Sequence, residues 1–246
     1  MKLVFLGTTG YHPNDQRQTA CLLIPSCGVM LDAGTGLYRA AGYLAIDTLD
    51  IFLTHAHLDH IVGLTYLFNL VHGRPLLRVR VHGEAEKLTA VEEHLFATAV
   101  FPKRPEMTMV PLTGPVPLAG NGRLTYFPLD HPGGGVGFRL DWPGHSMAYV
   151  TDTTAKVGAD YLAAIRGVDL LVHECYFRDS ESAWAETTRH SWTTAVAELA
   201  RASGARRLLL VHINPLETGS DPVGIDTARA LFPATDVAGD LMEVEF

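Results

Sequence analysis

The stretch Phe52-Leu53-Thr54-His55-Ala56-His57-Leu58-Asp59-His60 places four side chains that can bind a metal within six residues. It follows an apolar run that reads as a buried strand. Where a strand ends, the loop can point His55 and His57 together, while the turn into a helix carries Asp59 and His60 to a neighbouring position. Imidazole and carboxylate are ligands that a borderline cation such as zinc favours. The segment therefore predicts a metal centre at a strand end.

Three more residues of ligand type follow predicted apolar strands: His131, Asp152 and His212. Taken singly, a histidine at a strand end is more often a hydrogen-bonded surface residue, and an aspartate there is more often a turn or cap residue. Their occurrence together, after the cluster at 55–60, favours metal binding. We therefore expect seven ligand side chains to meet at one place.

The hydrophobic pattern predicts runs of strands that are interrupted by amphipathic helices in both halves of the chain. The expected strands are Leu3–Leu6, Ala20–Ile24, Gly28–Leu31, Asp50–Leu53, Val79–Val81, Leu124–Phe127, Val136–Leu140, Ser146–Val150, Asp169–Val172 and Leu208–Val211. Helices are expected near Asp59 and over Glu84–Ala99, Tyr161–Ile165, Trp192–Ala202 and Asp221–Leu231, with loops and edge strands over Pro102–Gly122. This pattern favours an α/β fold of two sheets covered by helices, a four-layer αββα sandwich.

The composition fits a soluble enzyme better than a nucleic-acid or membrane protein. The 246 residues are 47% hydrophobic, and because no long polar linker divides them, we expect a single domain over residues 1–246. The net charge of −8 leaves no general basic surface. The three cysteines form no CxxC pair and no apolar run reaches membrane-spanning length, so a reduced, cytoplasmic protein is expected. A homodimer is left open.

The sequence resembles the metallo-β-lactamase superfamily over nearly the whole chain. The resemblance rests on the opening stretch Phe5–Gly10, the tetrapeptide Leu31–Gly34, the histidine cluster and the later pair Val211-His212. Within the superfamily, the chain is similar to the ribonuclease Z branch and its relatives among the small phosphodiesterases.

Three features carry the similarity to that branch. Arg17 and Thr19 stand between the opening turn and the second strand, and His131 is followed shortly by Val136-Gly137-Phe138. The pairs His173-Glu174 and His190-Ser191 resemble paired elements of ribonuclease Z. The resemblance implies a metal-dependent hydrolase with the αββα fold.

The resemblance also implies an assignment of the ligands to two divalent ions, zinc first, with manganese or iron as alternatives. One ion takes His55, His57 and His131; the other takes Asp59, His60 and His212; and Asp152 bridges them. Two such ions can share a hydroxide and clamp the oxygens of an in-line displacement. Asp59 would then have a catalytic role as well, as acceptor of the hydroxide proton. Asp32 is expected to be structural and to orient ligands.

His190 and Glu174 are predicted to act as a catalytic pair. His190 would donate a proton to the leaving group, and Glu174 would fix its tautomer. The alternative reading places His190 at the start of the helix 191–202, with Ser191 as its N-cap and Glu174 as a paired core carboxylate.

Other side chains are expected to have no special role. His12, His72, His82, His94 and His145 are assigned to surface or turn positions. The aromatic residues near the opening loop and over Trp184–Trp192 could line a pocket, but core packing is the expectation.

The chain departs from the ribonuclease Z pattern in two places. The segment between His60 and His131 holds no long, basic, glycine-rich arm, and no cation occurs in Ile213–Glu217 after the last ligand. Polyanion binding depends on several neutralising Lys or Arg contacts. We therefore expect a small-molecule substrate and predict against tRNA as a partner.

The expected function is hydrolysis of a small or cyclic phosphodiester through a metal-bridging hydroxide. One alternative is hydrolysis of a carboxylic ester, lactone or thioester on the same scaffold, because a fold does not fix a substrate. From different classes, a di-iron redox protein or a non-catalytic cofactor-pathway protein also uses such ligands.

Overall fold

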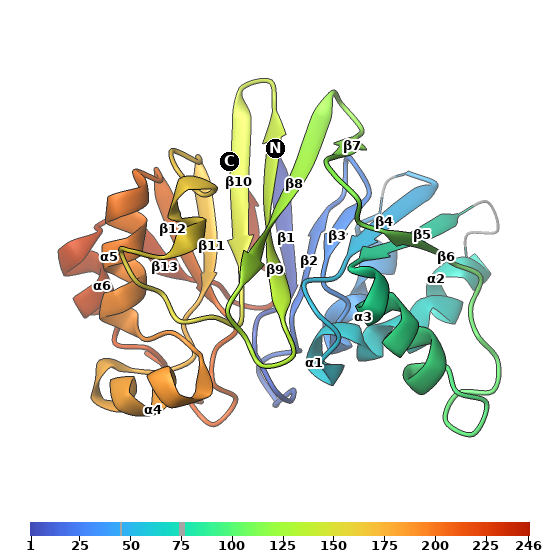
Figure 1. Ribbon diagram of the computed structural model, residues 1–246, viewed down its shortest axis with the longest axis horizontal. Helices are drawn as coiled ribbons and strands as arrows, with labels where there is room; N and C mark the ends of the chain where they lie inside the picture. Colours follow the sequence, from blue (N-terminus) through green and yellow to red (C-terminus); the bar gives the residue numbers. More distant parts are fainter. Residues whose placement is uncertain (45, 74–76) are drawn as a thin grey trace.

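The computed structural model describes residues 1–44, 46–73 and 77–246 (Figure 1). Within these residues the strands form two mixed, seven-stranded sheets. The first has the order β14 (Glu243–Glu245), β1 (Lys2–Gly7), β2 (Cys21–Ile24), β3 (Val29–Leu31), β4 (Thr48–Phe52), β5 (Arg78–Gly83), β6 (Thr108–Pro111). The second has the order β13 (Thr235–Val237), β12 (Arg207–Val211), β11 (Leu170–Glu174), β10 (His145–Val150), β9 (Gly135–Trp142), β8 (Gly122–Leu129), β7 (Val116–Leu118).

Short helices cover the outer faces of both sheets (Figure 1). Against the first sheet lie η1 (Thr35–Gly42), α1 (Leu58–Ile61), η2 (Val62–Tyr66), α2 (Leu67–Gly73), α3 (Ala85–Ala90) and η3 (Val91–Leu95). The second half contains η4 (Asp160–Ala163), η5 (Asp179–Glu181), α4 (Ser182–Thr188), α5 (Thr193–Ser203) and α6 (Ile225–Leu231). None of the helices in the described ranges is long and apolar enough to cross a bilayer.

The buried side chains form three hydrophobic clusters, as four layers require. One lies between the first sheet and its helices, one between the two sheets, and one between the second sheet and its helices. Strand β4 shows how the sequence builds two of them. Leu49 and Ile51 pack in the helix-side cluster, whereas Phe52 packs between the sheets, because successive side chains of a strand point to opposite faces. The predicted αββα sandwich is confirmed.

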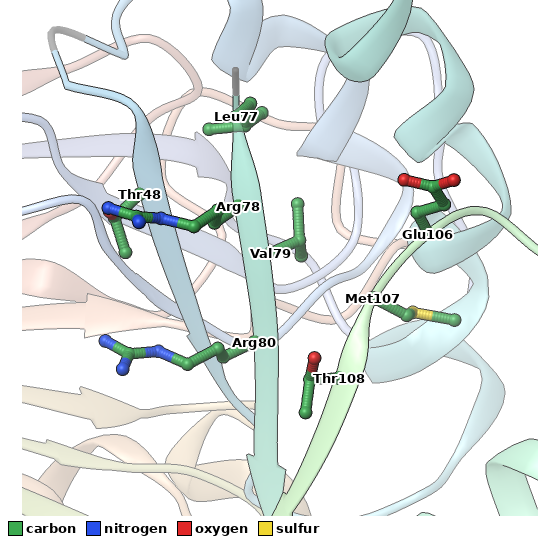
Figure 2. Close-up of a pocket in the computed structure, with 8 residues that line it drawn as sticks. All are labelled: Thr48, Leu77, Arg78, Val79, Arg80, Glu106, Met107 and Thr108. Atoms are coloured by element: carbon green, nitrogen blue, oxygen red, sulfur yellow. The ribbon is translucent and has the colours of Figure 1, made fainter. Parts of the chain in front are cut away.

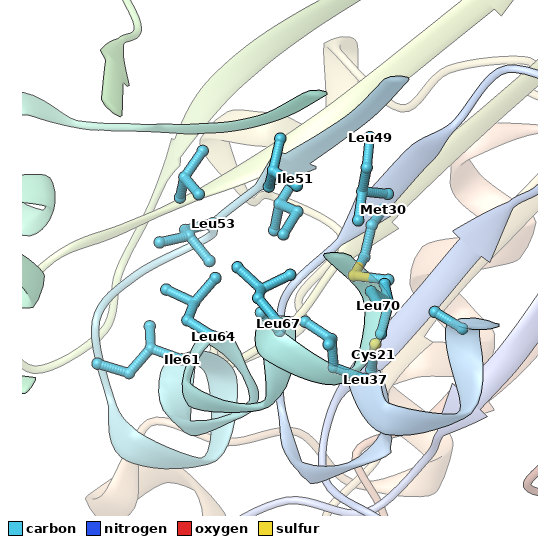
Figure 3. Packing of buried hydrophobic residues seen from close by; sticks show 14 of the residues in the cluster. Cys21, Met30, Leu37, Leu49, Ile51, Leu53, Ile61, Leu64, Leu67 and Leu70 are labelled. Carbon is cyan, nitrogen blue, oxygen red and sulfur yellow. The ribbon is translucent and has the colours of Figure 1, made fainter. Parts of the chain in front are cut away.

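The helices after the histidine cluster are anchored by one apolar face. Ile61, Leu64, Leu67 and Leu70 recur every three residues and pack against the strand residues Leu49, Ile51 and Leu53 (Figure 3). All four have 4% exposure or less. The segment that carries Asp59 and His60 is therefore held between a buried strand and a buried helical face.

The two sheets bring distant loops to one edge of the sandwich. Strands β3, β4 and β5 run parallel to one another, as do β10, β11 and β12. The carboxyl ends of parallel strands meet at the same edge of a sheet. The loops after β4, β10 and β12 carry six of the seven expected ligand residues, and the parallel strands bring them to one edge. The seventh, His131, comes from the connection between the antiparallel strands β8 and β9.

Two predicted helices are shorter than expected. The expected helix over Glu84–Ala99 ends its regular part at Ala90 and continues as the π-helical turn η3 to Leu95. The helix expected from Asp221 begins at Ile225, because the Asp221 carboxylate accepts the backbone amides of Gly224 and Ile225 at 2.8 and 3.0 Å. The apolar periodicity continues through these caps and turns, and it therefore overestimates the lengths.

The expectation that His82 occupies a surface or turn position is wrong. His82 lies in β5 with 3% exposure, its Nε2 is 2.8 Å from Asp50 Oδ1, and its ring stacks on Phe52 at 4.4 Å between centroids. Arg80 donates two hydrogen bonds of 2.6 Å to the same carboxylate. This buried polar cluster explains how a histidine is accommodated inside a strand.

Candidate metal centre

The structure brings all seven predicted ligand residues together. Ligand atoms of His55, His57 and His131 lie within 4.8 Å of one another, and so do those of Asp59, His60 and His212. Asp152 stands between the two groups, with Oδ2 3.2 Å from His60 Nε2 and Oδ1 3.8 Å from His131 Nε2. This placement is the one that the sequence predicts for two ions with a bridging carboxylate; ion binding stays a prediction.

The donor atoms fit cations better than they fit one another. His55 Nε2 is buried and has no hydrogen-bond partner among the described residues. The facing atoms His57 Nδ1 and His131 Nε2 are 3.3 Å apart, and His60 Nε2 and His212 Nε2 are also 3.3 Å apart. An unpaired buried nitrogen costs about 1–3 kcal/mol, which a bound ion would remove. The arrangement therefore suits divalent ions.

The two halves of the cluster differ in charge. Burial lowers the pKa values of His55, His57 and His131, that of His131 to about 4, so these rings are neutral and able to bind a metal. Burial also lowers the pKa of His60, but the surrounding Asp59 and Asp152 carboxylates raise it well above its ordinary value. One half is thus a set of neutral imidazoles, and the other is rich in carboxylate.

Three residues at strand ends adopt the left-handed backbone conformation that non-glycine residues rarely use. Their φ angles are 56° at Asp32, 51° at Asp152 and 53° at His212. Such residues cost of order 1–3 kcal/mol each and cluster at functional sites. A Cβ at Gly10 would lie 2.2 Å from Cε1 of the His212 ring, so the opening turn needs glycine beside this ligand.

Asp32 orients His60 from beneath the site. The carboxylate is fully buried, accepts hydrogen bonds from the Thr54 amide at 2.8 Å and the Tyr149 hydroxyl at 3.0 Å, and lies 2.8 Å from His60 Nδ1. A proton held on Nδ1 leaves Nε2 of His60 free as a ligand. These contacts confirm that Asp32 is structural.

The loop that carries His131 depends on two glycines and one lysine. Gly133 and Gly134 have φ angles of 83° and 76°, and the Gly134 amide donates to the His131 carbonyl at 2.8 Å. Lys87, from α3, donates to the Gly133 carbonyl. The loop is thus fixed from the opposite sheet.

Glu174 and His190 are in contact, as the predicted catalytic pair requires. Glu174 is fully buried at the end of β11, and its Oε1 lies 3.1 Å from His190 Nδ1 and accepts the Thr153 amide at 2.6 Å. Burial lowers the pKa of His190, but the Glu174 carboxylate outweighs it and raises the pKa to about 9. With Nδ1 engaged, Nε2 is the nitrogen left for substrate.

His190 also lies close to two of the expected ligands. A ligand atom of its ring lies within 4.8 Å of those of Asp152 and His212. Its ring stacks on that of His212, with 5.6 Å between centroids. His190 therefore borders the cavity that the expected ligands line, and with Nδ1 beside Glu174 its Nε2 is the ring nitrogen that remains for a ligand.

The reading of Ser191 as a helix cap is wrong. Helix α5 begins at Thr193, and its early amide at Thr194 donates to Asp179 Oδ1 at 2.8 Å. The Ser191 hydroxyl instead donates to the Thr153 carbonyl at 2.6 Å and accepts the Ala155 amide at 2.9 Å. It joins the loop after β10 to the segment before α5, and so it supports the same two loops as Glu174.

Five of the seven expected ligands form the floor of an open cavity of about 490 Å³. It is lined by Tyr11, His57, Asp59, His131, Pro132, Asp152, Tyr176, Phe177, Trp184, Thr188, His190 and His212. The expectation of core packing is wrong for Tyr11 and Trp184, which are 74% and 60% exposed. The signal for Trp184 was its place among polar and small residues in α4, where it has no apolar neighbours that would form a core face.

A second cavity, of about 640 Å³, lies at the other end of β5 (Figure 2). Arg78 and Arg80 extend from the strand on the same side; Arg78 lies beside Thr48, whereas Arg80 lies apart from it and donates to Asp50 (Figure 2). None of the seven expected ligands lines this cavity.

Known proteins align with the chain in part and in full. A protein named Ribonuclease Z from Nostoc sp. is 41% identical over 106 residues, which are 42% of this chain and 32% of that protein. A protein of the same name from Bradyrhizobium sp. is 28% identical, and the alignment spans 97% of both chains. The crystal structure of the metallo-beta-lactamase fold protein YhfI from Bacillus subtilis is similar to this chain, with a TM-score of 0.83, 20% identity and 99% of each chain covered.

The prediction against tRNA as a partner is contradicted by these relatives. Proteins named Ribonuclease Z, a class that acts on tRNA, align along nearly the whole chain although it lacks the basic arm. The inference failed because it took one missing segment and the net charge as a measure of RNA binding. Net charge does not report the local potential of a site that holds cations.

A family model matches most of the chain. The model described as "Beta-lactamase superfamily domain" matches residues 28–213, a range that begins before β3 and contains all seven expected ligands. The two sheets, the helical layers and this match agree with one another. The chain is a hydrolase of the metallo-β-lactamase fold and belongs to the beta-lactamase superfamily.

Proposed function

We propose that this protein hydrolyses phosphodiester bonds with two divalent ions held by His55, His57, His131, Asp59, His60, His212 and the bridging Asp152. The observation that carries the proposal is that one cavity is lined both by five members of this ligand set and by His190, whose Nδ1 faces the buried Glu174. A purely structural metal site needs no such pair and no open face.

The ions, when bound, supply a water of lowered pKa and neutralise charge on the phosphate oxygens. Two side chains of the protein are assigned the proton transfers. Asp59 Oδ2 lies 3.3 Å from His60 Nε2 and 3.4 Å from His212 Nε2, and it accepts the Tyr11 amide at 2.8 Å. It is held in place to accept the proton of the attacking water.

His190 is assigned the other proton transfer. Glu174 holds Nδ1, and Nε2 faces the cavity, where it can protonate the leaving oxygen. An alkoxide such as a ribose oxygen is a poor leaving group unless it is protonated. The pair therefore suits a phosphodiester with an alcohol on its leaving side.

The relatives named Ribonuclease Z support RNA as one source of this bond, and a smaller nucleotide diester presents the same chemistry. A carboxylic ester, lactone or thioester is the alternative substrate class on this scaffold. A two-ion site suits in-line displacement at phosphorus, because one ion can stabilise the attacking oxygen and the other the leaving oxygen.

The test is a panel of substrates on one zinc- or manganese-loaded preparation, with chelator-treated protein as control. We expect hydrolysis of bis(p-nitrophenyl) phosphate and of a 3′-extended precursor tRNA to exceed that of p-nitrophenyl acetate, and to disappear in the control. Rapid metal-dependent cleavage of the acetate or a lactone, with both phosphodiesters intact, would overturn the proposal.

A further inference from the structure

The mouth of the cavity is built from aromatic side chains that come from distant parts of the chain. We call Tyr11, Tyr176 and Trp184 the aromatic wall. All three line the cavity above the ligands. Tyr11 and Trp184 are 74% and 60% exposed, although large apolar side chains usually bury most of their surface. Exposure of two aromatic rings in one cavity is a mark of a ligand-binding surface.

Packing does not explain Trp184. It lies in α4, a helix of seven residues whose one buried side chain is Ala185. Thr188, one turn later on the same helix face, also lines the cavity, and its hydroxyl donates to the Trp184 carbonyl at 2.9 Å. The face of α4 that Trp184 shares with Thr188 therefore points to the cavity and not to a core.

The wall begins at the reacting centre and continues outward. The Tyr176 ring stacks on His190 with 4.9 Å between centroids and 24° between planes. The Tyr11 amide donates to Asp59 Oδ2 at 2.8 Å, so this side chain starts beside an expected ligand. A group that contacts the wall must therefore be attached close to the phosphorus atom.

No Lys or Arg is among the residues that line this cavity in the described parts of the chain. Beyond the phosphate, no lining Lys or Arg is available for an ion pair, so ring contacts and neutral polar groups such as Thr188 must supply the binding energy. Stacking of a base on an aromatic side chain contributes about 1–3 kcal/mol, roughly 5- to 150-fold in affinity.

We infer that the aromatic wall binds a planar aromatic ring, a nucleobase, carried by the nucleotide next to the bond that is cleaved. The inference rests on the proposed function, because it assumes a phosphodiester at the metal centre. It assigns Trp184 and Tyr11 as specificity residues that act on substrate affinity and leave the chemical step unchanged.

The test compares two competitive inhibitors of bis(p-nitrophenyl) phosphate hydrolysis that differ by one base: adenosine 5′-monophosphate and ribose 5-phosphate. We expect the nucleotide to bind about tenfold or more tightly. Trp184→Ala and Tyr11→Asn should each remove most of this advantage. Asparagine is chosen because Tyr11 has a φ of 60°, which asparagine tolerates.

The controls separate the ring from the fold. Trp184→Phe should keep most of the advantage, since it keeps a ring. Tyr38→Ala removes an exposed tyrosine that does not line this cavity and should change nothing. Equal inhibition by the two compounds in the wild type, or an advantage that survives both Trp184→Ala and Tyr11→Asn, overturns the inference.

Quenching of tryptophan fluorescence tests the same contact without catalysis. Trp184 is the one tryptophan of the three that lines the cavity, since Trp142 is 7% exposed and the half-buried Trp192 is not among the lining residues, so adenosine 5′-monophosphate should quench mainly Trp184. The quench should be lost in Trp184→Phe. If no phosphodiester is hydrolysed, the proposed function fails, yet this titration still decides the inference: saturable quenching supports it, and unchanged fluorescence overturns it.

Two further substrates identify where the base comes from. A 3′-extended RNA and a dinucleotide are each compared with a version that lacks the base beside the scissile bond. A rise in KM of roughly tenfold for the abasic RNA assigns the base to RNA, and a rise confined to the dinucleotide assigns it to a small nucleotide. No change in either overturns the inference.

Discussion

The floor and the mouth of the cavity are built in opposite ways. Directly behind the floor, His60 and Glu174 have no exposed surface. His60 Nδ1 lies beside the Asp32 carboxylate, and Glu174 accepts backbone amides from two loops, those of Thr153 and Ser191. At the mouth, Tyr11 and Trp184 are mostly exposed, and Trp184 stands on a short helix with one buried residue. The predicted chemistry is thus placed among buried, hydrogen-bonded side chains, and the proposed selectivity among exposed side chains that can change without loss of the fold.

Replacement of Asp152 with Ala should have the largest effect. Asp152 Oδ2 lies within 3.4 Å of both His60 Nε2 and His212 Nε2, and Oδ1 faces the other histidine group, so its loss weakens both halves. We expect metal content to fall below one ion per chain and kcat/KM to fall by on the order of 10³ or more. Elemental analysis and rates on the same preparation measure this. Retention of two ions with normal rates would show that Asp152 is needed neither for metal binding nor for hydrolysis.

Replacement of His190 with Ala should keep the metal content and lower kcat by on the order of 10²–10⁴ for an alkoxide leaving group. The loss should shrink for p-nitrophenolate, which departs without a proton. Glu174→Gln should act in the same direction and more mildly, because the ring is kept but its tautomer is no longer fixed. Loss of metal from the His190→Ala protein, or equal losses for both leaving groups, would assign His190 a ligand or structural role.

The variant Asp32→Asn tests how strongly His60 depends on its hydrogen-bond partner for metal binding. Asparagine tolerates the φ of 56° and can still accept the Thr54 amide, but its NH₂ group would face the proton on His60 Nδ1. We expect metal affinity to fall by about 10- to 100-fold with a folded protein. Competition with a chromophoric chelator measures the affinity. An unchanged affinity would show that His60 does not need this partner.

Asp50→Asn should have the smallest effect on activity, with kcat/KM unchanged within about twofold, because the Asp50–Arg80–His82 cluster lies outside the cavity. Burial raises the pKa of Asp50, but hydrogen bonds from His82 and Arg80 outweigh it and hold the pKa below its ordinary value of about 4. A lowered pKa in the folded state stabilises the fold above that value and stops doing so as the pH falls through the lower one.

The wild type should therefore exceed Asp50→Asn by about 1–3 kcal/mol in free energy of unfolding at pH 7, and the gap should shrink below about pH 4. Chemical denaturation at a series of pH values, on metal-free samples of both proteins, provides the measurement. A gap that is constant down to pH 3 would show that the carboxylate charge is not the source of the stability.

The sequence predicted the floor well because its ligands obey a local rule. HxHxDH places four ligand residues in the short segment that joins β4 to α1. His131, Asp152 and His212 each follow an apolar strand that parallel or neighbouring strands bring to one edge. Buried strands are read from their apolar runs, and so the αββα sandwich followed as well. The sequence predicted that Asp32 would orient a ligand, but it did not predict Tyr149 as a hydrogen-bond partner of Asp32.

The mouth could not be predicted in the same way. Tyr11 and Trp184 are more than 170 positions apart, and whether each is buried depends on which loop lies over it. The expectation of core packing holds for Trp192, which packs against a buried cluster, and is wrong for these two. The predicted start of the last helix was wrong for a related reason. Asp221 caps that helix with its carboxylate, and apolar spacing does not reveal this contact.

The central claim is that hydrolysis depends on ions held by the seven ligand residues, and metal removal followed by reloading tests it most directly. Protein treated with chelator, then dialysed and titrated with zinc or manganese, is assayed at each step for bound metal and for hydrolysis of bis(p-nitrophenyl) phosphate. We predict that activity disappears with the metal and returns as occupancy rises to about two ions per chain. Full activity in protein with almost no bound metal would show that hydrolysis does not depend on these ions. Two bound ions without any hydrolysis would show that the metal centre does not support this reaction.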